Sequence, residues 1–324
     1  MKKVIRMGTR DSELALWQAN TVKDRLEALG YQCELVPVKS TGDLQLDQPL
    51  YELGITGIFT KTLDVAMIRG TIDIAVHSMK DVPTALPKGI VQAAVLPRAN
   101  PRDILVHKGT DFLNSEGKVA TGSLRRKAQW LHRYPLHEMM PLRGNVNTRL
   151  QKLQDNDWNA AIFAAAGLER IDKLPENYTE LQWMIPAPAQ GAMMVVAMEN
   201  DRECREILAQ LNDQDTEICT RVERDFLREL EGGCTAPIGA LATIEQNKLF
   251  FEGVLLSLDG EQRLTVKEEC PLDQLQGFGN RCAQQLLMRG GTELMRQIRQ
   301  EMNSTQPSPE GNETGERNDL PKTS

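Results

Sequence analysis

Two proline-bearing segments interrupt a regular alternation of strand-like and helix-like stretches, and they constrain the fold more than any other feature. They are Pro97-Arg98-Ala99-Asn100-Pro101 and Pro186-Ala187-Pro188-Ala189-Gln190-Gly191. The alternation restarts after the first segment, and another apolar strand, 193–198, follows the second. Strands that alternate with helices favour α/β lobes. The sequence therefore predicts that the chain leaves one lobe, builds another and returns, which gives two hinged lobes with a cleft.

We call the two proline-bearing segments the first and second crossing. The first lobe is predicted from the residues before the first crossing. Asp11 or Ser12 caps an amphipathic helix that ends at Gly30. A buried strand over 72–76 leads into His77-Ser78-Met79-Lys80-Asp81-Val82-Pro83. We expect these polar residues at the carboxyl edge of a parallel sheet, where such folds bind ligands. The other predicted elements are strands over 4–8 and 33–39, a helix over 63–68 and a mobile loop over 44–57.

The second lobe repeats this alternation, which predicts another parallel α/β lobe. Its helices are predicted to begin at Ser123, Asn145 and about Ala166, after strands near 103–107, 118–121, 137–142 and 159–164. A smaller α+β domain follows, with a helix over 215–230, strands over 236–243, 248–257 and 263–269, and one helix over 272–299.

These patterns predict domain boundaries. The first lobe takes residues 1–97 and 192–212, the second takes 101–186, and the third domain takes 214–302. Residues 303–324 carry one apolar side chain, Leu320, among Ser, Thr, Asn, Glu and Pro. Such a segment cannot bury enough apolar surface to order itself, so a disordered tail is predicted.

Composition narrows the function classes. A net charge of -7 over 324 residues argues against nucleic acid as the main partner. No apolar run approaches the roughly 18 residues that span a bilayer, and the N-terminus shows no apolar signal core, so a cytoplasmic location is expected. Six cysteines lack a CxxC pair and are expected to be free thiols. No spacing of His and Cys predicts a metal site.

Basic residues gather at predicted helix starts, which indicates a small anionic ligand inside an acidic protein. Ser123-Leu124-Arg125-Arg126 places two guanidinium groups beside free backbone N–H groups. Arg143-Gly144-Asn145-Val146-Asn147-Thr148-Arg149 repeats the arrangement, and Thr9-Arg10-Asp11-Ser12 does so in the first lobe. Arg170 and Lys61 are further basic candidates. Because arginine pairs bidentately with carboxylates, the set suits a ligand that carries many of them.

Two more segments are candidates for chemistry. Lys80-Asp81 is either a loop ion pair or a carboxylate that stabilises a developing cation and moves a proton. Glu231-Gly232-Gly233-Cys234-Thr235 places a thiol between small residues, so Cys234 is either a buried thiol or a point of reaction or attachment. His77 has no visible partner and is interpreted as structural.

Four of these motifs, in order and in register, resemble the porphobilinogen deaminase family, also called hydroxymethylbilane synthase. They are His77 to Pro83, Ser123 to Arg126, Leu142-Arg143-Gly144-Asn145 with Thr148-Arg149, and Glu231 to Cys234, within about residues 4–300. The resemblance implies a three-domain, monomeric transferase of tetrapyrrole (heme) biosynthesis, whose first two lobes look like type II periplasmic binding proteins. It also implies a dipyrromethane cofactor, attached through a thioether at Cys234. On it, four porphobilinogen molecules condense with loss of ammonia, and hydrolysis releases hydroxymethylbilane.

The resemblance also implies roles for individual residues. Asp81 is the implied catalytic carboxylate. Cys234, Lys80, Asp81, Ser123, Arg125, Arg126 and Arg143 are implied to bind the cofactor, and Arg10, Ser12, Arg143, Arg149, Arg170 and Lys61 to bind substrate. No metal is implied. The same hinge and arginines would serve a two-lobed organic-anion binding or sensing protein without catalysis, which is the alternative.

Three positions depart from the pattern of the family. Thr56 stands where a lysine is common, so a basic contact from the loop is in doubt. Gly122 replaces a common hydroxyl residue, and Pro188-Ala189 replaces a more usual Val-Gly in the second crossing.

Overall fold

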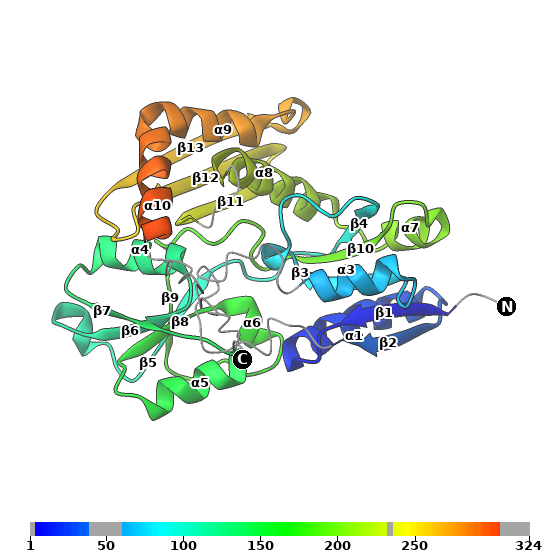
Figure 1. Ribbon diagram of the computed structural model, residues 1–324, viewed down its shortest axis with the longest axis horizontal. Helices are drawn as coiled ribbons and strands as arrows, with labels where there is room; N and C mark the ends of the chain where they lie inside the picture. The colour runs from blue at the N-terminus through cyan, green and yellow to red at the C-terminus, as the bar shows by residue number, and fades with distance from the viewer. Residues whose placement is uncertain (1–3, 39–59, 232–235, 305–324) are drawn as a thin grey trace, which may run out of the picture.

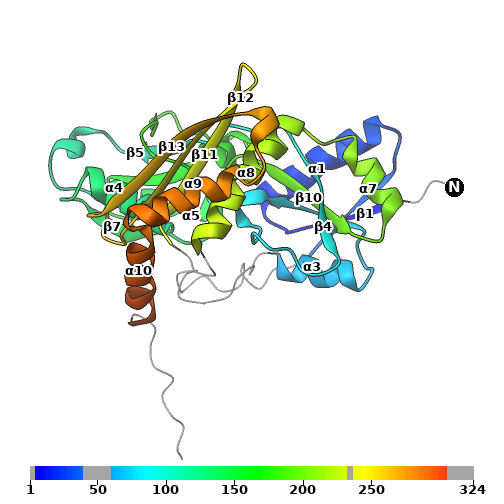
Figure 2. The same ribbon diagram turned by 90° about the horizontal axis from the view of Figure 1, so that it is seen from above.

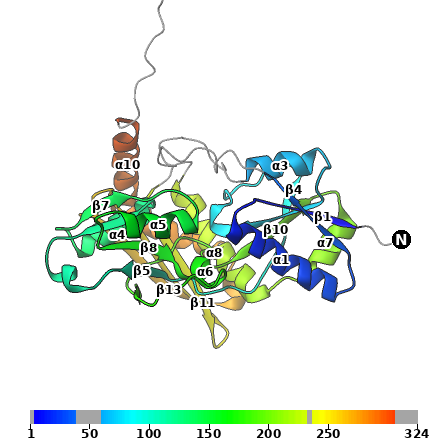
Figure 3. The same cartoon turned by 90° about the horizontal axis from the view of Figure 1, so that it is seen from below.

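The computed structural model describes residues 4–38, 60–231 and 236–304. Three sheets organise these residues (Figure 1). Two five-stranded sheets, in the orders β2-β1-β3-β10-β4 and β7-β6-β8-β5-β9, form the two lobes, and a three-stranded sheet, β11-β12-β13, forms a third unit. The views in Figures 2 and 3 show the two lobes side by side, with α10 projecting away from the rest.

The first lobe is a three-layer unit. One core cluster joins the sheet to α1 through Ala19, Val22 and Leu26, and to α7 through Cys204 and Leu208. A separate cluster joins the opposite sheet face to α3. Apolar strands covered on both faces need helices on both sides. The elements are β1 (Ile5–Thr9), α1 (Glu13–Ala28), β2 (Cys33–Pro37), α3 (Lys61–Ile68), β3 (Ile74–Ser78), β4 (Ile90–Val95), β10 (Met193–Met198) and α7 (Arg202–Ala209).

The second lobe has the same layered build. Trp130 of α4 packs in a cluster on one side of the sheet. Leu153 of α5 and Leu168 of α6 pack in another cluster on the other side. The elements are β5 (Asp103–His107), β6 (Lys118–Thr121), α4 (Leu124–Arg133), β7 (Glu138–Pro141), α5 (Val146–Asp155), β8 (Ala160–Ala164), α6 (Ala165–Glu169) and β9 (Tyr178–Glu180).

The third unit packs three helices against one face of its antiparallel sheet. The predicted single helix over 272–299 is wrong, because two α-helices occupy this stretch. Gly290 adopts φ 109°, outside the helical region, and ends the run. The elements are α8 (Gln214–Glu231), β11 (Ile238–Glu245), β12 (Lys248–Leu256), β13 (Arg263–Pro271), α9 (Phe278–Leu286) and α10 (Thr292–Ser304). Thus α10 includes the first two residues of the predicted tail, and 305–324 lie outside the described residues.

The sheets of both lobes are mixed, whereas the sequence predicted parallel ones. In the first lobe β1 pairs in parallel with β2 and β3, but β10 runs antiparallel to β3 and β4. In the second lobe β6 pairs in parallel with β7 and β8, but β5 runs antiparallel to β8 and β9. Both antiparallel strands follow a crossing. Each returns from the hinge, so its first residue lies at the edge where the parallel strands end.

Helix starts agree with the sequence. The side chains of Ser12, Ser123 and Asn145 accept hydrogen bonds from backbone N–H groups at the starts of α1, α4 and α5. The strand predicted over 72–76 lies at 74–78, and β4 and β9 were not predicted. The predicted loop over 44–57 lies outside the described residues, as does Thr56. Within the described ranges, no helix is both long and apolar enough to cross a bilayer.

Candidate active site

The candidate side chains follow the carboxyl ends of parallel strands in both lobes. Arg10 follows β1, and the 3-10 turn Met79–Asp81 follows β3, so Lys80 and Asp81 stand where that strand ends. In the second lobe the residues that follow strand ends are Ser123, Arg125 and Arg126 after β6, Arg143 and Arg149 after β7, and Arg170 after β8 and α6.

Charged residues of each lobe shift the pKa of a basic residue in the other lobe. Burial and the charge of Arg126 lower the pKa of Lys80 to about 8, against the attraction of Asp81 and Asp103. Burial and Arg126 also lower the pKa of Arg149 to about 10, again opposed by Asp81 and reinforced by Arg143 and Arg10. Neighbouring cations disfavour the charged forms of Lys80 and Arg149, and anionic groups bound beside them would stabilise those forms. Asp81 itself is exposed on its turn.

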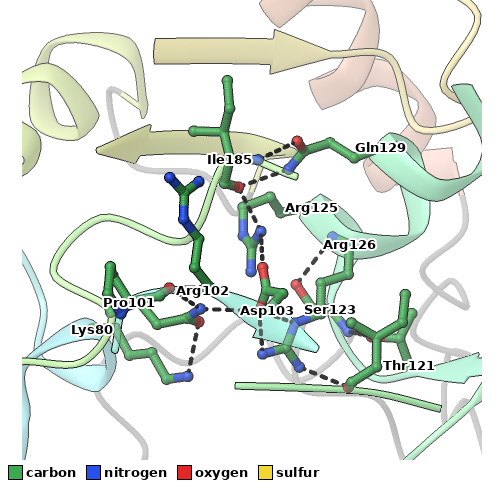
Figure 4. A network of polar contacts seen from close by, with 12 residues as sticks. Lys80, Pro101, Arg102, Asp103, Thr121, Ser123, Arg125, Arg126, Gln129 and Ile185 are labelled. Atoms are coloured by element: carbon green, nitrogen blue, oxygen red, sulfur yellow. Dashed lines mark hydrogen bonds and ion pairs between the residues drawn. The ribbon is translucent and has the colours of Figure 1, made fainter. Parts of the chain in front are cut away.

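Asp103, which the sequence reading missed, lies at the centre of the second-lobe part of the site (Figure 4). Its Oδ2 accepts a hydrogen bond from Arg125 Nη1 at 2.7 Å, and its Oδ1 accepts one from Arg126 Nε at 2.9 Å. Burial would raise the pKa of this fully buried carboxyl, but the two guanidinium groups lower it well below its usual range. Arg125 and Arg126 are thus buried and bound to Asp103, a partner that the sequence analysis did not predict.

Gln190 connects this cluster to the first lobe. Its Nε2 donates to Asp103 Oδ1 at 2.9 Å and to Pro101 O at 2.8 Å, and its Oε1 accepts from Lys80 Nζ at 3.1 Å. Because Gln190 belongs to the second crossing and Pro101 to the first, the network spans both hinge segments. The arrangement orients Lys80 through an uncharged amide and leaves its ammonium without a direct bond to Asp103.

The remaining predicted residues occupy different settings. Arg170 Nη2 donates to Gly191 O at 2.6 Å, its guanidinium lies over the Trp17 ring, and burial lowers its pKa to about 10. The hydroxyls of Ser12 and Ser123 cap helices. Lys61 is exposed at the first position of α3. His77 is buried in β3, where burial and Arg10 lower its pKa to about 4, in agreement with a structural role.

Helix α8 of the third unit binds both crossings through Glu223, whose side chain is fully buried. Its carboxylate accepts from Arg98 Nη1 at 2.6 Å and from the backbone N–H groups of Ala189 at 2.6 Å and Ala242 at 2.7 Å. Arg98 and Ala189 belong to different crossings, and Ala242 belongs to β11. One carboxylate therefore joins the two hinge segments to the third unit.

Two departures from the family pattern have structural counterparts. A Cβ at Gly122 would collide with the carbonyl oxygen of Leu142, so this backbone leaves no room for the usual hydroxyl residue. Ala189 adopts φ 62°, a left-handed conformation that favours glycine. Its N–H bond to Glu223 holds the residue in that conformation.

The predicted attachment residue, Cys234, lies outside the described residues. All five described cysteines are free thiols. Burial raises the pKa of the Cys219 and Cys282 thiols to about 12, so these two are poor nucleophiles at neutral pH. Among the residues that the structure describes, no group of His, Cys, Asp and Glu side chains could hold a metal ion.

Two family models match this chain. Residues 5–206 match "Porphobilinogen deaminase, dipyromethane cofactor binding domain", and residues 217–288 match "Porphobilinogen deaminase, C-terminal domain". The chain belongs to the porphobilinogen deaminase family. The crossings, the Asp103 cluster and the Lys80-Asp81 turn all lie within the first of these matches.

Curated relatives match over nearly the whole chain. Porphobilinogen deaminase of Syntrophotalea carbinolica is 41% identical over 298 residues, which are 90% of this chain and 95% of that protein. Porphobilinogen deaminase of Pelotomaculum thermopropionicum is 42% identical over 308 residues, 93% and 99% of the two chains. Among solved structures, a probable amino-acid ABC transporter extracellular-binding protein of Bacillus subtilis is 13% identical, with a TM-score of 0.40, over 65% of this chain and 90% of that one.

Proposed function

We propose that this enzyme condenses four porphobilinogen molecules stepwise, with loss of ammonia, onto a covalently bound dipyrromethane, and releases hydroxymethylbilane by hydrolysis. Family membership supports the reaction. The set of cations around Asp81 is the observation that best supports this assignment of the active site. Besides burial, the charge of Arg126 lowers the pKa of both Lys80 and Arg149, and the charge of Asp81 opposes this in both. Arg143 and Arg10 act in addition on Arg149, and Asp103 and Arg125 act on Lys80.

The described residues fit a ligand that is rich in carboxylates. Burial and neighbouring like charges lower the pKa values of Lys80 and Arg149, and the carboxylates of a ligand would raise them. Arg125 Nε is buried and has no hydrogen-bond partner within the described residues. A donor in this state is available to an acceptor from outside the protein. We propose that Lys80, Ser123, Arg125, Arg126 and Arg143 hold the cofactor, which Cys234 tethers.

We propose that substrate is bound by cations and hydroxyl groups from both lobes. Arg170 bonds to Gly191 of the second crossing, and Arg10 follows β1. We propose that these two, with Ser12, Lys61, Arg143 and Arg149, bind the acetate and propionate groups of porphobilinogen and of the growing chain. Arginine forks pair two N–H groups with each carboxylate and so fix its orientation.

Asp81 is the proposed catalytic carboxylate. When bound, dipyrromethane supplies the pyrrole carbon to which the first substrate is joined. The Asp81 carboxylate stabilises positive charge on the substrate ring as ammonia leaves, and it holds or returns the proton that each condensation releases. Its exposure on a turn lets it face a bulky substrate. We also propose that the enzyme acts as a cytoplasmic monomer, as the resemblance implies.

Intact mass spectrometry tests the tether. The purified protein should carry an adduct with the mass of a dipyrromethane, and Cys234→Ser should lose both the adduct and ammonia release. Cys282→Ser is the matched control, because its thiol is buried in the third unit, and it should keep both. An unmodified mass in active protein, or an adduct that survives Cys234→Ser, would contradict the assignment. Reversible ligand binding without ammonia release would favour a binding protein instead.

A further inference from the structure

The turn that carries Lys80 and Asp81 is held by a side chain from the third unit. Arg224 of α8 donates from Nη1 to Val82 O at 2.9 Å and to Met79 O at 3.3 Å, and from Nη2 to Pro83 O at 2.6 Å. Its neighbour one helical turn on, Arg228, donates from Nη2 to Thr84 O at 2.7 Å. The acceptors bracket the two functional residues on both sides.

Other described contacts hold the ends of this turn and the Lys80 side chain: Met79 and Val82 are buried in a core cluster of the first lobe, and Lys80 Nζ donates to Gln190 Oε1 at 3.1 Å. Within the turn, Val82 N donates to Met79 O at 3.2 Å, and Met79 N donates to Ala192 O at 3.0 Å. Both bonds lie at its ends, and Asp81 is exposed. A guanidinium is planar and rigid, so one that spans three carbonyl oxygens fixes their relative positions. Arg224 is itself buried, at 7% exposure, so its own orientation is fixed by packing.

Helix α8 is a rigid reference for this turn. Phe226 and Leu230 anchor the helix in the core of the third unit, and Glu223 fixes it to both crossings. The helix ends at Glu231, three positions before Cys234 in the sequence. A displacement of about 1 Å at a catalytic group can cost about 100-fold in rate. The position of Asp81 relative to α8 is therefore of direct consequence for turnover.

We propose that Arg224 is a positioning residue for the condensation: it holds the Asp81 turn on α8 through the carbonyls of Met79, Val82 and Pro83. The proposal rests on the proposed function, because it takes Asp81 as the catalytic carboxylate. Arg224 acts through the backbone of the turn. Apart from Lys80, which lies on this turn, the cations proposed to bind carboxylate groups belong to other elements.

Arg224→Lys tests the proposal, because lysine keeps the charge but cannot span three carbonyls. The turnover number per cofactor-loaded molecule, with loading measured by intact mass, should fall about tenfold or more. KM should stay within about threefold, since the binding cations remain. Leu294→Ala is the matched control. This substitution leaves a cavity in the core of the third unit, away from the turn. It should therefore lower the melting temperature and leave the turnover number of the folded protein unchanged.

Amide hydrogen exchange gives a readout that is independent of activity. Exchange in residues 78–84 should speed up in Arg224→Lys and stay unchanged in Leu294→Ala. Arg228→Gln removes the bond to Thr84 O together with an exposed ion pair to Asp225 on the same helix. It should give a smaller effect in the same direction, and it serves if Arg224→Lys does not fold. Unchanged exchange at 78–84, or a turnover loss that Leu294→Ala matches, overturns the proposal. A wild-type protein that forms no product overturns the proposed function instead, and the exchange result stands apart from it.

Discussion

At the scale of single residues, Asp81 differs from the other carboxylate of the site in burial and in bonding. Asp103 is fully buried and bound to two guanidinium groups, whereas Asp81 is exposed on a turn between Lys80 and Val82. A carboxylate that is saturated with donors is a poor proton acceptor, and one that faces solvent beside cations can exchange protons with a substrate. The structure therefore separates a carboxylate that organises the site from one that can react.

Asp81→Asn keeps the size of the side chain and removes its charge. We expect it to fold normally and to bind porphobilinogen with little change in KM, while turnover falls by about 100-fold or more, because the proton acceptor is lost. The rate of ammonia release checks this result. Asp111→Asn, a change at an exposed carboxylate of the second lobe, should leave the rate unaltered. Turnover near that of the wild type in Asp81→Asn would exclude the proposed role.

We propose that Lys80, besides holding the cofactor, contacts the carboxylates of incoming porphobilinogen, so that its charge makes substrate binding depend on pH. Its pKa is lowered to about 8 by burial and by Arg126, so it is charged below pH 8 and becomes neutral as pH rises through that value. An ordinary lysine stays charged to about pH 10. We therefore expect KM for porphobilinogen to be steady at pH 6–7 and to rise between about pH 7 and 9. In Lys80→Gln, KM should be high at pH 7 and nearly flat with pH. Lys88→Gln, at an exposed site, should keep the wild-type profile, and a rise that persists in Lys80→Gln would assign it to another group.

At the scale of elements, α8 is the helix that binds the hinge. Glu223 accepts from Arg98, Ala189 N and Ala242 N while fully buried. In Glu223→Gln, an amide N–H faces one of these donors, and the largely buried Arg98 loses its counter-ion. We expect the free energy of unfolding to drop by about 2–4 kcal/mol, measured by urea titration. In the Glu223→Gln protein, Arg98→Met should lower the free energy of unfolding by much less than it does in the wild type, because the two residues form one ion pair. A loss below about 0.5 kcal/mol would show that the bonds to Glu223 contribute little.

The sequence predicted those features that depend on neighbouring residues in the chain. Caps at Ser12, Ser123 and Asn145 are local hydrogen bonds, so they could be read from the residues alone, and with them the cations at strand ends. Strand direction could not be read, because it depends on the edge at which each crossing returns to its sheet. Asp103 and Gln190 were missed for that reason. Each stands at or just before the start of an antiparallel strand, at the edge where the parallel strands end.

At the scale of the whole molecule, a polar contact also joins the lobes away from the hinge. Glu13 of α1 accepts from Lys173 Nζ at 2.7 Å and from Asn147 Nδ2 at 2.7 Å, and Lys173 Nζ also donates to Asn147 Oδ1 at 2.8 Å. Glu13 belongs to the first lobe, and Asn147 and Lys173 belong to the second. Hydrogen bonds from Lys173 and Asn147 lower the pKa of Glu13, so the contact is ionic at neutral pH. Because its groups are partly exposed, added salt weakens it.

This contact should set how far the lobes separate. We expect Lys173→Glu to increase the radius of gyration in solution, measured by small-angle X-ray scattering at low salt, because two carboxylates then face each other. Raising NaCl to about 0.5 M should move the wild type toward the same value by screening and should change the variant little. The exchanged pair, Glu13→Lys with Lys173→Glu, restores opposite charges and should return the wild-type value and its salt dependence. Equal radii in all three proteins at low salt would show that the crossings and Glu223 alone hold the lobes, because those bonds are buried and insensitive to surface charge.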